Sequence, residues 1–275
     1  MIIGIFTYGT RGDLQPYVAL ALGLIAKGHK VTISATEDFG KFVEGFGIPF
    51  IPLFGDAELW MNSVEGQGIL RSENPIKLMR YYFKVLHDNR EPIRRSYFDA
   101  IDKVDFIIAN SMTLPIVSTI AEKQNKKMAL TYFMPPVVPT KEFPLGDWES
   151  HHKITAFLTV PKQKRENHFL DEMPAGLDEW FSQGSKPIYI GFGSNGVGNI
   201  KKFTGIVAAI LEKTDERILF ATGWSRFDQM PKDKNLFVTK YVNHEVVFPR
   251  CKAGIFHGGA GKDHRAKKIG YSYPG

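Results

Sequence analysis

Residues 2–16 are IIGIFTYGTRGDLQP, an apolar run that passes through a glycine turn into a helix-like stretch. The apolar residues do not alternate with polar ones, which is typical of a strand covered on both faces of a parallel sheet. Gly9 and Gly12 allow the turn that follows to bring its backbone close to a ligand. This segment predicts the first βα unit of a doubly wound α/β fold.

The same alternation of strands and helices continues through the first half. We expect strands and helices in the order Ile2–Tyr8, Leu14–Lys27, Lys30–Ala35, Phe39–Phe46 and Ile48–Pro52. A long helical region begins at Asn74-Pro75, with one interruption at Pro92, and it leads to Asp105–Ala109, Leu114–Gln124 and Met128–Phe133. Prolines between Pro135 and Pro144 cannot join a central strand or a helix, so the first domain is expected to end there.

A second βα alternation follows and predicts a second Rossmann-like domain. Its strands are expected at Pro187–Phe192, Arg217–Ala221, Leu236–Thr239 and Ala253–Phe256, with a helix at Lys201–Lys213. A doubly wound domain usually has about five strands or more, so we expect this domain to be incomplete. The predicted organisation is an N-terminal domain at 1–144, a linker and crossover at 145–186, and a partial domain at 187–275.

Composition limits the compartment and the partners. The chain starts directly with a strand, without the charged and apolar regions of a secretory signal, and its apolar runs fall short of the roughly 18 residues that span a bilayer. The single cysteine, Cys251, permits no internal disulfide, which favours a reducing compartment. A cytoplasmic protein is expected. Basic runs interleaved with aromatic residues are missing, which argues against a nucleic-acid partner.

The formal net charge of +6 is unevenly distributed. Residues 1–150 carry 16 basic minus 17 acidic side chains, and residues 151–275 carry 19 minus 12. The excess in the second half suits an anionic ligand such as a nucleotide diphosphate. A solvated basic surface explains it equally well.

Asp13 ends the first glycine turn, at the carboxyl edge of the predicted sheet, where open α/β sheets bind ligands. Its carboxylate is placed to take a proton from an acceptor hydroxyl. The alternative is that Asp13 only caps the helix that starts at Leu14. A dinucleotide site is disfavoured, although Glu37 follows at a suitable distance, because only two of the three fingerprint glycines are present.

A second glycine cluster, His257-Gly258-Gly259-Ala260-Gly261, follows the last predicted strand and is expected to open a helix that can bind a phosphate. His257 could donate to a phosphate oxygen, although a histidine at a strand end is often structural. The turn at Gly193-Ser194 follows the first strand of this domain and faces the same kind of crevice. No Asp-x-Asp pair, Walker loop or zinc spacing occurs, so a metal-independent reaction is expected.

These motifs together resemble one family. The segments Thr10-Arg11-Gly12-Asp13-Leu14-Gln15-Pro16, Tyr189–Ser194 and Phe256–Gly261 are similar to signatures of the GT-B glycosyltransferases, with a family 28-like N-terminal domain, that glycosylate sterols, other lipids and macrolide or glycopeptide aglycones. The resemblance implies an N-terminal acceptor domain, a C-terminal donor domain, and no cofactor besides a UDP- or dTDP-hexose co-substrate. It also implies inversion at the anomeric carbon.

The resemblance assigns roles residue by residue. Asp13 would be the base, and Gly12, beside it in the signature turn, would contribute to donor binding. His257, Gly258, Gly259, Ala260 and Gly261, with Gly193 and Ser194, would hold the donor, and the Tyr241–Pro249 segment would lie near the nucleobase. The acceptor would be a sterol, a lipid or another apolar hydroxyl compound, which implies contact with a membrane surface.

Three departures from the family pattern concern the donor side. Lys262 replaces a threonine, and both the acidic–glutamine pair that grips the sugar and the last helix of the family are missing from the sequence. A C-terminal truncation would explain all three. The alternative function is therefore a non-catalytic remnant that binds a ligand or partner without turnover.

Overall fold

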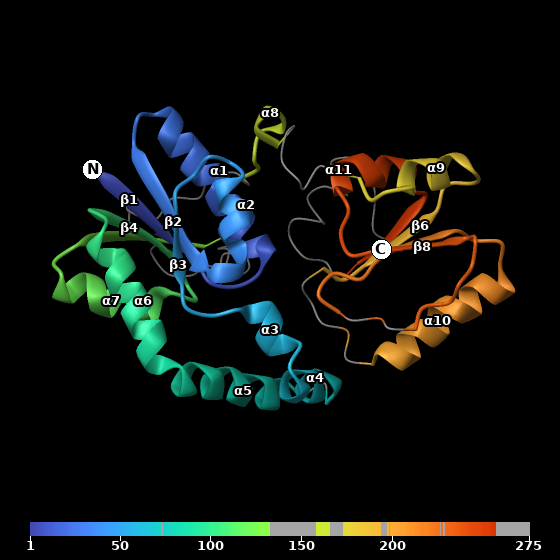
Figure 1. Cartoon of the computed structure of the whole chain (residues 1–275), viewed down its shortest axis with the longest axis horizontal. Coiled ribbons are helices and arrows are strands. Elements are labelled where there is room, and N and C mark those ends of the chain that lie inside the picture. The colour runs from blue at the N-terminus through green and yellow to red at the C-terminus, as the bar shows by residue number, and fades with distance from the viewer. Residues whose placement is uncertain are drawn as a thin grey trace, which may run out of the picture. The chain divides into compact units, whose positions relative to one another are not determined.

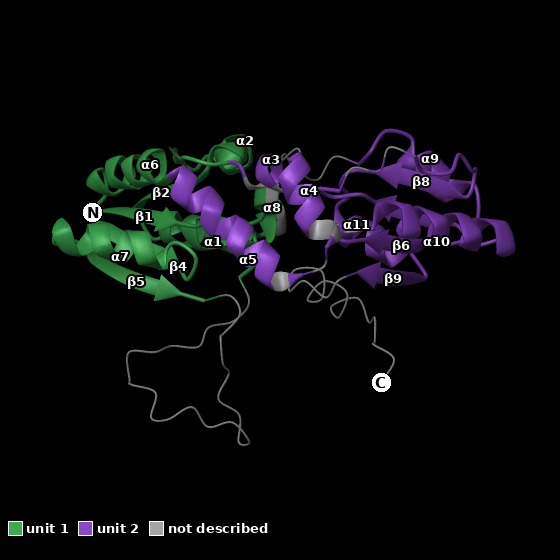
Figure 2. Ribbon diagram, turned by 90° about the horizontal axis from the view of Figure 1, so that it is seen from below, with its two compact units in different colours: residues 1–55, 90–165 green, residues 56–89, 166–275 purple. Residues whose placement is uncertain are grey.

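A computed structural model describes residues 1–72, 74–132, 158–165, 173–193, 197, 199–225, 227 and 229–256 (Figure 1). The chain divides into two compact units, residues 1–55 with 90–165 and residues 56–89 with 166–275 (Figure 2). Each unit contains one parallel sheet. The domain boundary expected at residue 144 lies outside the described residues, so the predicted domain limits stay predictions.

The first unit is built on a five-stranded parallel sheet with the order β3-β2-β1-β4-β5. The strands are β1 (Ile2–Phe6), β2 (Lys30–Thr36), β3 (Phe50–Leu53), β4 (Phe106–Asn110) and β5 (Lys127–Thr131). From β1 the chain adds β2 and β3 on one side, and it then adds β4 and β5 on the other side of β1. Strand order therefore reverses between β1 and β4. Ligands bind at such a switch point, beyond the carboxyl ends of the strands.

Helices cover this sheet. They are α1 (Arg11–Ala26), η1 (Glu37–Phe39), α2 (Gly40–Glu44), α6 (Arg90–Asp102) and α7 (Leu114–Lys123), and α8 (Lys162–Arg165) belongs to the same unit. Phe6 stacks on Tyr97 of α6, and both rings are buried. Gly28 has φ +86° and ends α1, as expected from the sequence.

The long helical region differs from the prediction at its interruption. The chain forms α3 (Ala57–Met61), α4 (Val64–Arg71) and α5 (Pro75–Asp88), and then α6. The break falls at Asn89, which ends α5, and the interruption expected at Pro92 is wrong. Pro92 lies in the first turn of α6, where a missing N–H leaves no helical hydrogen bond unmade.

The second unit contains a four-stranded parallel sheet with the order β8-β7-β6-β9, the number of strands that the sequence predicts. The strands are β6 (Ile188–Gly191), β7 (Ile218–Ala221), β8 (Leu236–Thr239) and β9 (Ala253–Phe256). Helical elements are α9 (Leu177–Ser182), α10 (Ile200–Lys213), α11 (His244–Val247) and η3 (Phe248–Arg250). The two sheets confirm the predicted α/β class with two Rossmann-like halves.

Two apolar clusters pack against the second sheet. One includes Trp180, Tyr189, Val247 and Cys251, and the other includes Ile190, Val207 and Phe220. Among the described residues, no helix is both long and apolar enough to cross a bilayer.

We expect Cys251 to resist thiol reagents while the protein is folded. Its side chain is buried, and burial raises the pKa of the thiol to about 12, so the reactive thiolate is scarce near the usual thiol pKa of about 8.5. Ellman's reagent should label the native chain slowly and the chain unfolded in guanidinium quickly. Because Cys251 is the only cysteine, rapid labelling of the native protein would contradict its burial.

Candidate functional site

The first candidate site is the turn that joins β1 to α1. Thr10 is the N-cap of α1, and the helix begins at Arg11 rather than at Leu14 as predicted. Asp13 is therefore the third residue of the helix, and the interpretation of Asp13 as the N-cap is wrong. Thr10, whose hydroxyl is also a favoured N-cap, had not been considered for this role.

Asp13 is held by a capping box. Its Oδ2 accepts hydrogen bonds from the backbone N–H of Thr10 at 2.7 Å and from the Thr10 hydroxyl at 3.0 Å, while the Thr10 oxygen accepts from the N–H of Gly12 at 3.2 Å. Both bonds to the carboxylate reach the same oxygen. Among the described residues, no hydrogen bond reaches Oδ1. This second oxygen of the half-buried side chain can therefore accept a hydrogen bond or a proton from another group.

Gly9 makes room for this carboxylate. Its φ is +141°, and a Cβ at this position would lie 2.5 Å from Oδ2 of Asp13. Any residue other than glycine would therefore both strain the backbone and displace the Asp13 carboxylate.

We expect Gly9→Ala to destabilise the protein by about 1–3 kcal/mol, because strain and the clash with Asp13 act together. Gly28→Ala is the matched control, since Gly28 also has a positive φ but a Cβ there meets nothing within 4 Å. Thermal unfolding of both variants measures the difference. A Gly9→Ala variant that melts no lower than Gly28→Ala would show that the carboxylate is not confined by Gly9.

Asn110, at the end of β4, fixes the same turn from the neighbouring strand. Its side-chain amide donates to the Thr7 hydroxyl and to the Tyr8 carbonyl, both at 3.1 Å, and its Oδ1 accepts from the N–H of Thr113 at 2.9 Å. Asn110 is buried. Asn110 was not predicted from the sequence, although its place at the end of the strand beside β1 is the signal that could have found it.

Tyr17 lies in the next turn of α1 and is completely buried. Its hydroxyl bonds the Thr131 hydroxyl at 2.6 Å. Burial raises the pKa of Tyr17 to about 12, and the charge of Asp13 contributes in the same direction. Tyr17 therefore stays protonated at neutral pH, which leaves the Asp13 carboxylate as the better proton acceptor of the two.

The second candidate site is the turn after β6, at the carboxyl edge of the second sheet. Gly193 has φ +64° and Gly223 has φ +60°. A Cβ on Gly223 would lie 1.8 Å from the Gly193 carbonyl oxygen, which also accepts a hydrogen bond from the N–H of Trp224 at 3.0 Å. The turn after β6 and the turn after β7 are thus in direct backbone contact.

The remaining predicted donor residues, Ser194, His257, Gly258, Gly259, Ala260 and Gly261, lie outside the described residues. The register of the sheet still constrains where the last cluster starts, because Gly191 of β6 pairs with Phe256 of β9. The chain thus leaves β9 at the strand end that neighbours the Gly193 turn.

His244 is a residue of this edge that the sequence analysis did not single out, although it lies in the Tyr241–Pro249 segment. It begins α11, and its Nε2 lies 3.0 Å from the Tyr189 hydroxyl. The two rings meet edge to face at 5.5 Å. Burial raises the pKa of Tyr189, so the hydroxyl stays protonated as a partner for the histidine.

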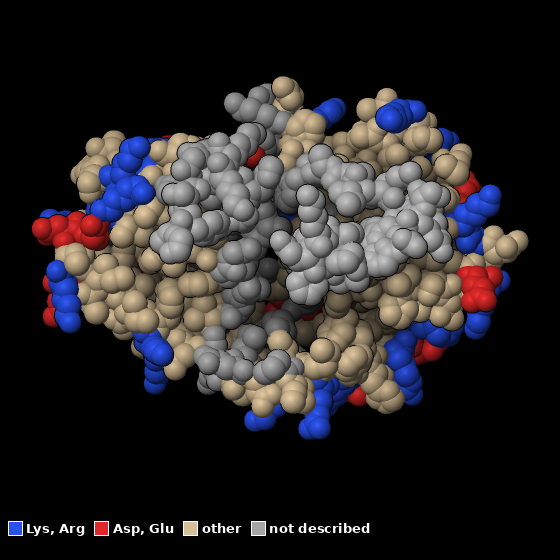
Figure 3. Space-filling model, turned by 180° about the vertical axis from the view of Figure 1, so that it is seen from behind, with Lys and Arg blue, Asp and Glu red and all other residues tan. Residues whose placement is uncertain are grey.

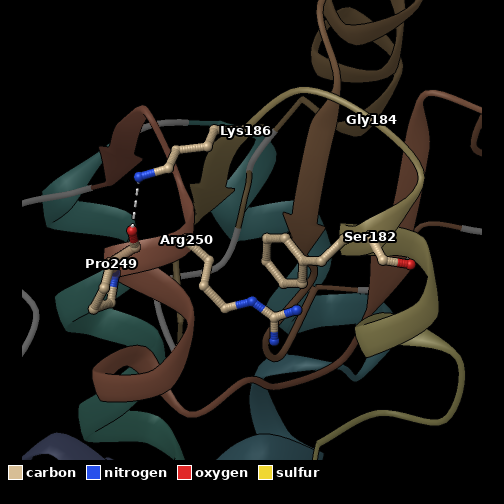
Figure 4. A pocket seen from close by; sticks show the side chains of 6 residues that line it. Ser182, Gly184, Lys186, Pro249 and Arg250 are labelled. Carbon is tan, nitrogen blue, oxygen red and sulfur yellow. Dashed lines mark hydrogen bonds between the residues drawn. The ribbon is translucent and has the colours of Figure 1, made fainter.

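A cavity of about 270 Å³ lies at the opposite, amino edge of the second sheet (Figure 4). Lys186 precedes β6, and Arg250 precedes β9. The Lys186 ammonium donates to the Pro249 carbonyl at 3.3 Å, and Arg250 pairs with Asp178 and lies over the Phe181 ring. Both cations thus have partners within the protein. Ligands of open parallel sheets bind at the carboxyl ends of the strands, whereas this cavity lies at the amino ends.

The charged and metal-binding side chains of the described residues do not single out a further site. On the face shown in Figure 3, lysines and arginines lie beside acidic side chains on the coloured surface, without a continuous basic field. In the part of the chain that the structure describes, no group of three or more metal-ligating side chains is found.

Comparisons with known proteins agree with this architecture. The chain is 29% identical to the sterol 3-beta-glucosyltransferase UGT80A2 of Arabidopsis thaliana, over 95% of this chain and 52% of that protein. The structure of UGT89C1 from Arabidopsis thaliana complexed with UDP matches with a TM-score of 0.63 at 16% identity, covering 96% of this chain and 77% of that one. The glycosyltransferase SsfS6 of Streptomyces sp. SF2575, complexed with thymidine diphosphate, matches with a TM-score of 0.58 at 17% identity, covering 98% and 80%.

Each of the two parallel sheets reverses its strand order beside its first strand, at β1 and at β6. Together they define a GT-B fold of the kind found in glycosyltransferases. The glycosyltransferase family 28 N-terminal domain matches residues 3–144. The chain belongs to this family. It spans about half the length of the curated sterol glucosyltransferase of Arabidopsis that it matches.

Proposed function

We propose that this chain serves an inverting, metal-independent transfer of a hexose from a UDP- or dTDP-sugar to a hydroxyl group of a sterol, lipid or other apolar acceptor. The observation that supports it most is the Asp13 carboxylate. It lies at the switch point of the first sheet, with one oxygen held by Thr10 and the other without a hydrogen bond from the described residues.

The proposed step balances as a single displacement. The acceptor oxygen attacks the anomeric carbon from the face opposite the diphosphate, and the bond to the diphosphate oxygen breaks. Asp13 takes the proton of the acceptor hydroxyl as the new glycosidic bond forms. One displacement inverts the anomeric configuration. Asn110 positions the turn that carries Asp13, through Thr7 and Tyr8.

The donor is proposed to bind at the second sheet. His257 and the amides of residues 258–261 would hold the diphosphate, and Gly193 and Ser194 would allow close backbone approach. Gly12, in the first unit, is proposed as a further donor-binding residue. The support is the glycine-rich sequence after β9 and the names of similar structures, which contain UDP or thymidine diphosphate. The apolar acceptor rests on the sterol glucosyltransferase relatives.

The test is a transfer assay with radiolabelled UDP-glucose and cholesterol dispersed in detergent. Label should enter the organic extract as a glycoside with the β configuration, because the donor sugar is α-linked. An α-linked product would contradict a single displacement. Binding of UDP without any transfer to cholesterol or to other apolar alcohols would instead support a chain that binds without turnover.

A further inference from the structure

Tyr17 connects helix α1 with the far side of the first sheet. The helix packs against β2, whereas Thr131 ends β5, the edge strand that lies beyond β1 and β4 (Figure 2). The hydroxyl of Tyr17 lies 2.6 Å from the Thr131 hydroxyl. The Thr131 hydroxyl donates its single proton to the Ala109 carbonyl at 3.2 Å, so the Tyr17 hydroxyl is the donor of the first bond. A directed chain of hydrogen bonds thus joins α1 to β5 and β4.

Helix α1 is weakened between its first two turns, because Pro16 interrupts its own hydrogen bonds. Pro16 lies inside the helix and has no N–H, so the Gly12 carbonyl lacks the donor that a helix supplies four residues later. Tyr17 follows directly, and it lies four residues after Asp13, on the same face of the helix. A restraint on Tyr17 therefore acts close to the Asp13 carboxylate, where the helix itself is least firmly bonded.

Two anchors hold the segment that carries Asp13, and they converge on one place in the sheet. Asn110 holds the turn before the helix, and Thr131 holds the second turn of the helix through Tyr17. Asn110 and Thr131 are register partners at the ends of β4 and β5. The first two turns of α1 are thus fixed to adjacent strand ends, beside the switch point between β1 and β4.

We propose that Tyr17 is a positioning residue for Asp13. Its bond to Thr131 fixes the first two turns of α1 at the carboxyl edge, and this gives the second carboxylate oxygen of Asp13 one place relative to the acceptor. Tyr17 is completely buried, so it acts through the helix and not by touching a substrate. The functional part of the proposal rests on the role proposed for Asp13 as the base. Position matters for such a group, because a displacement of about 1 Å can cost a hundredfold in rate.

The anchor is tested first without any substrate, by deuterium exchange of the α1 amides in the full chain. Tyr17→Phe keeps the ring and removes the hydroxyl, and Thr131→Val keeps the shape and removes the partner. Each should speed exchange in residues 11–17 roughly fivefold or more, and the double variant should add little, because the same bond is lost. Tyr81→Phe is the matched control. It removes another buried tyrosine hydroxyl, which bonds the Trp60 carbonyl at 2.9 Å, and it should leave exchange in residues 11–17 unchanged.

The consequence for Asp13 is tested in the transfer assay. Tyr17→Phe should lower kcat roughly tenfold and leave KM for UDP-glucose unchanged, whereas Tyr81→Phe should leave both unchanged. In an Asp13→Asn background, Tyr17→Phe should lower kcat no further, because it acts through that carboxylate. A merely structural role of Tyr17 would lower the rate by the same factor in both backgrounds.

Two results would overturn the proposal. The first is exchange in residues 11–17 that is no faster in Tyr17→Phe than in Tyr81→Phe. The second is a loss of kcat from Tyr17→Phe that is as large in the Asp13→Asn background as in the wild type. A wild-type chain that transfers no glucose would instead contradict the proposed function, and the exchange data would still decide whether Tyr17 anchors α1.

Discussion

Asp13→Asn is expected to lower the rate of glycosyl transfer roughly a hundredfold or more with little change in melting temperature. Asparagine keeps a side-chain oxygen that can accept from the N–H of Thr10, so the capping box loses little. It cannot accept the proton of an acceptor hydroxyl. The measurement is initial rate and thermal unfolding of the two proteins under the same conditions.

Thr10→Ala is the matched control for this experiment. It removes the N-cap hydroxyl while the Asp13 carboxylate remains, and it should cost about 1 kcal/mol of stability. If Asp13 acts only through helix capping, Asp13→Asn should keep both its stability and its activity, whereas Thr10→Ala should still lose stability. Full activity in Asp13→Asn would send the search for the base elsewhere in the first unit.

His257→Ala is expected to weaken UDP binding by about 1.5–3 kcal/mol, a loss of roughly 10- to 150-fold in affinity, because a charge-assisted contact to the diphosphate disappears. Titration calorimetry with UDP measures it directly. The prediction rests on the sequence pattern after β9, since His257 lies outside the described residues. Should both proteins bind UDP equally, the assignment of His257 fails.

His29→Ala is the control for non-specific effects of removing a histidine. His29 is exposed and follows α1 at the amino end of β2, away from the carboxyl edge of that sheet. Its replacement should leave UDP affinity unchanged. A similar loss in both variants would indicate a general effect of charge or folding.

Strands were predictable because their apolar runs carry a direct signal. β8 and β9 have the predicted bounds, and the ends of β6 and β7 differ from prediction by only a residue. Helix starts were harder to predict, because a start depends on which of several nearby polar residues is the N-cap. Thr10 and Asp13 are both suitable, and only the coordinates distinguish the N-cap from the third helical residue.

The helices α3 and α4 were not predicted from the sequence, because they contain only 5 and 8 residues and such short helices carry few repeats of the helical period. Pro92 misled the prediction of the break before α6 because proline is harmless in the first turn of a helix and disruptive only later. The class of protein was accessible from the motifs, and the family match over residues 3–144 confirms it.

Asp13 was predictable as a candidate, but its surroundings were not. Gly9 has no side chain and so leaves room for the Asp13 carboxylate. Asn110 donates a hydrogen bond to the turn from a strand about a hundred residues further along the chain. Such contacts depend on strand order, which local sequence patterns do not encode. The roles proposed for Asp13 and His257 stay predictions until the variants are measured.

The backbone contact between Gly193 and Gly223 also bears on engineering. With only hydrogen at Gly223 and the N–H of Trp224 bonded to the Gly193 carbonyl, neither turn can be exchanged for one from another enzyme without its companion. A graft at either turn should therefore transfer residues 191–193 and 222–225 as one cassette. Chimeras that split the pair are expected to misfold at the edge they were meant to redesign.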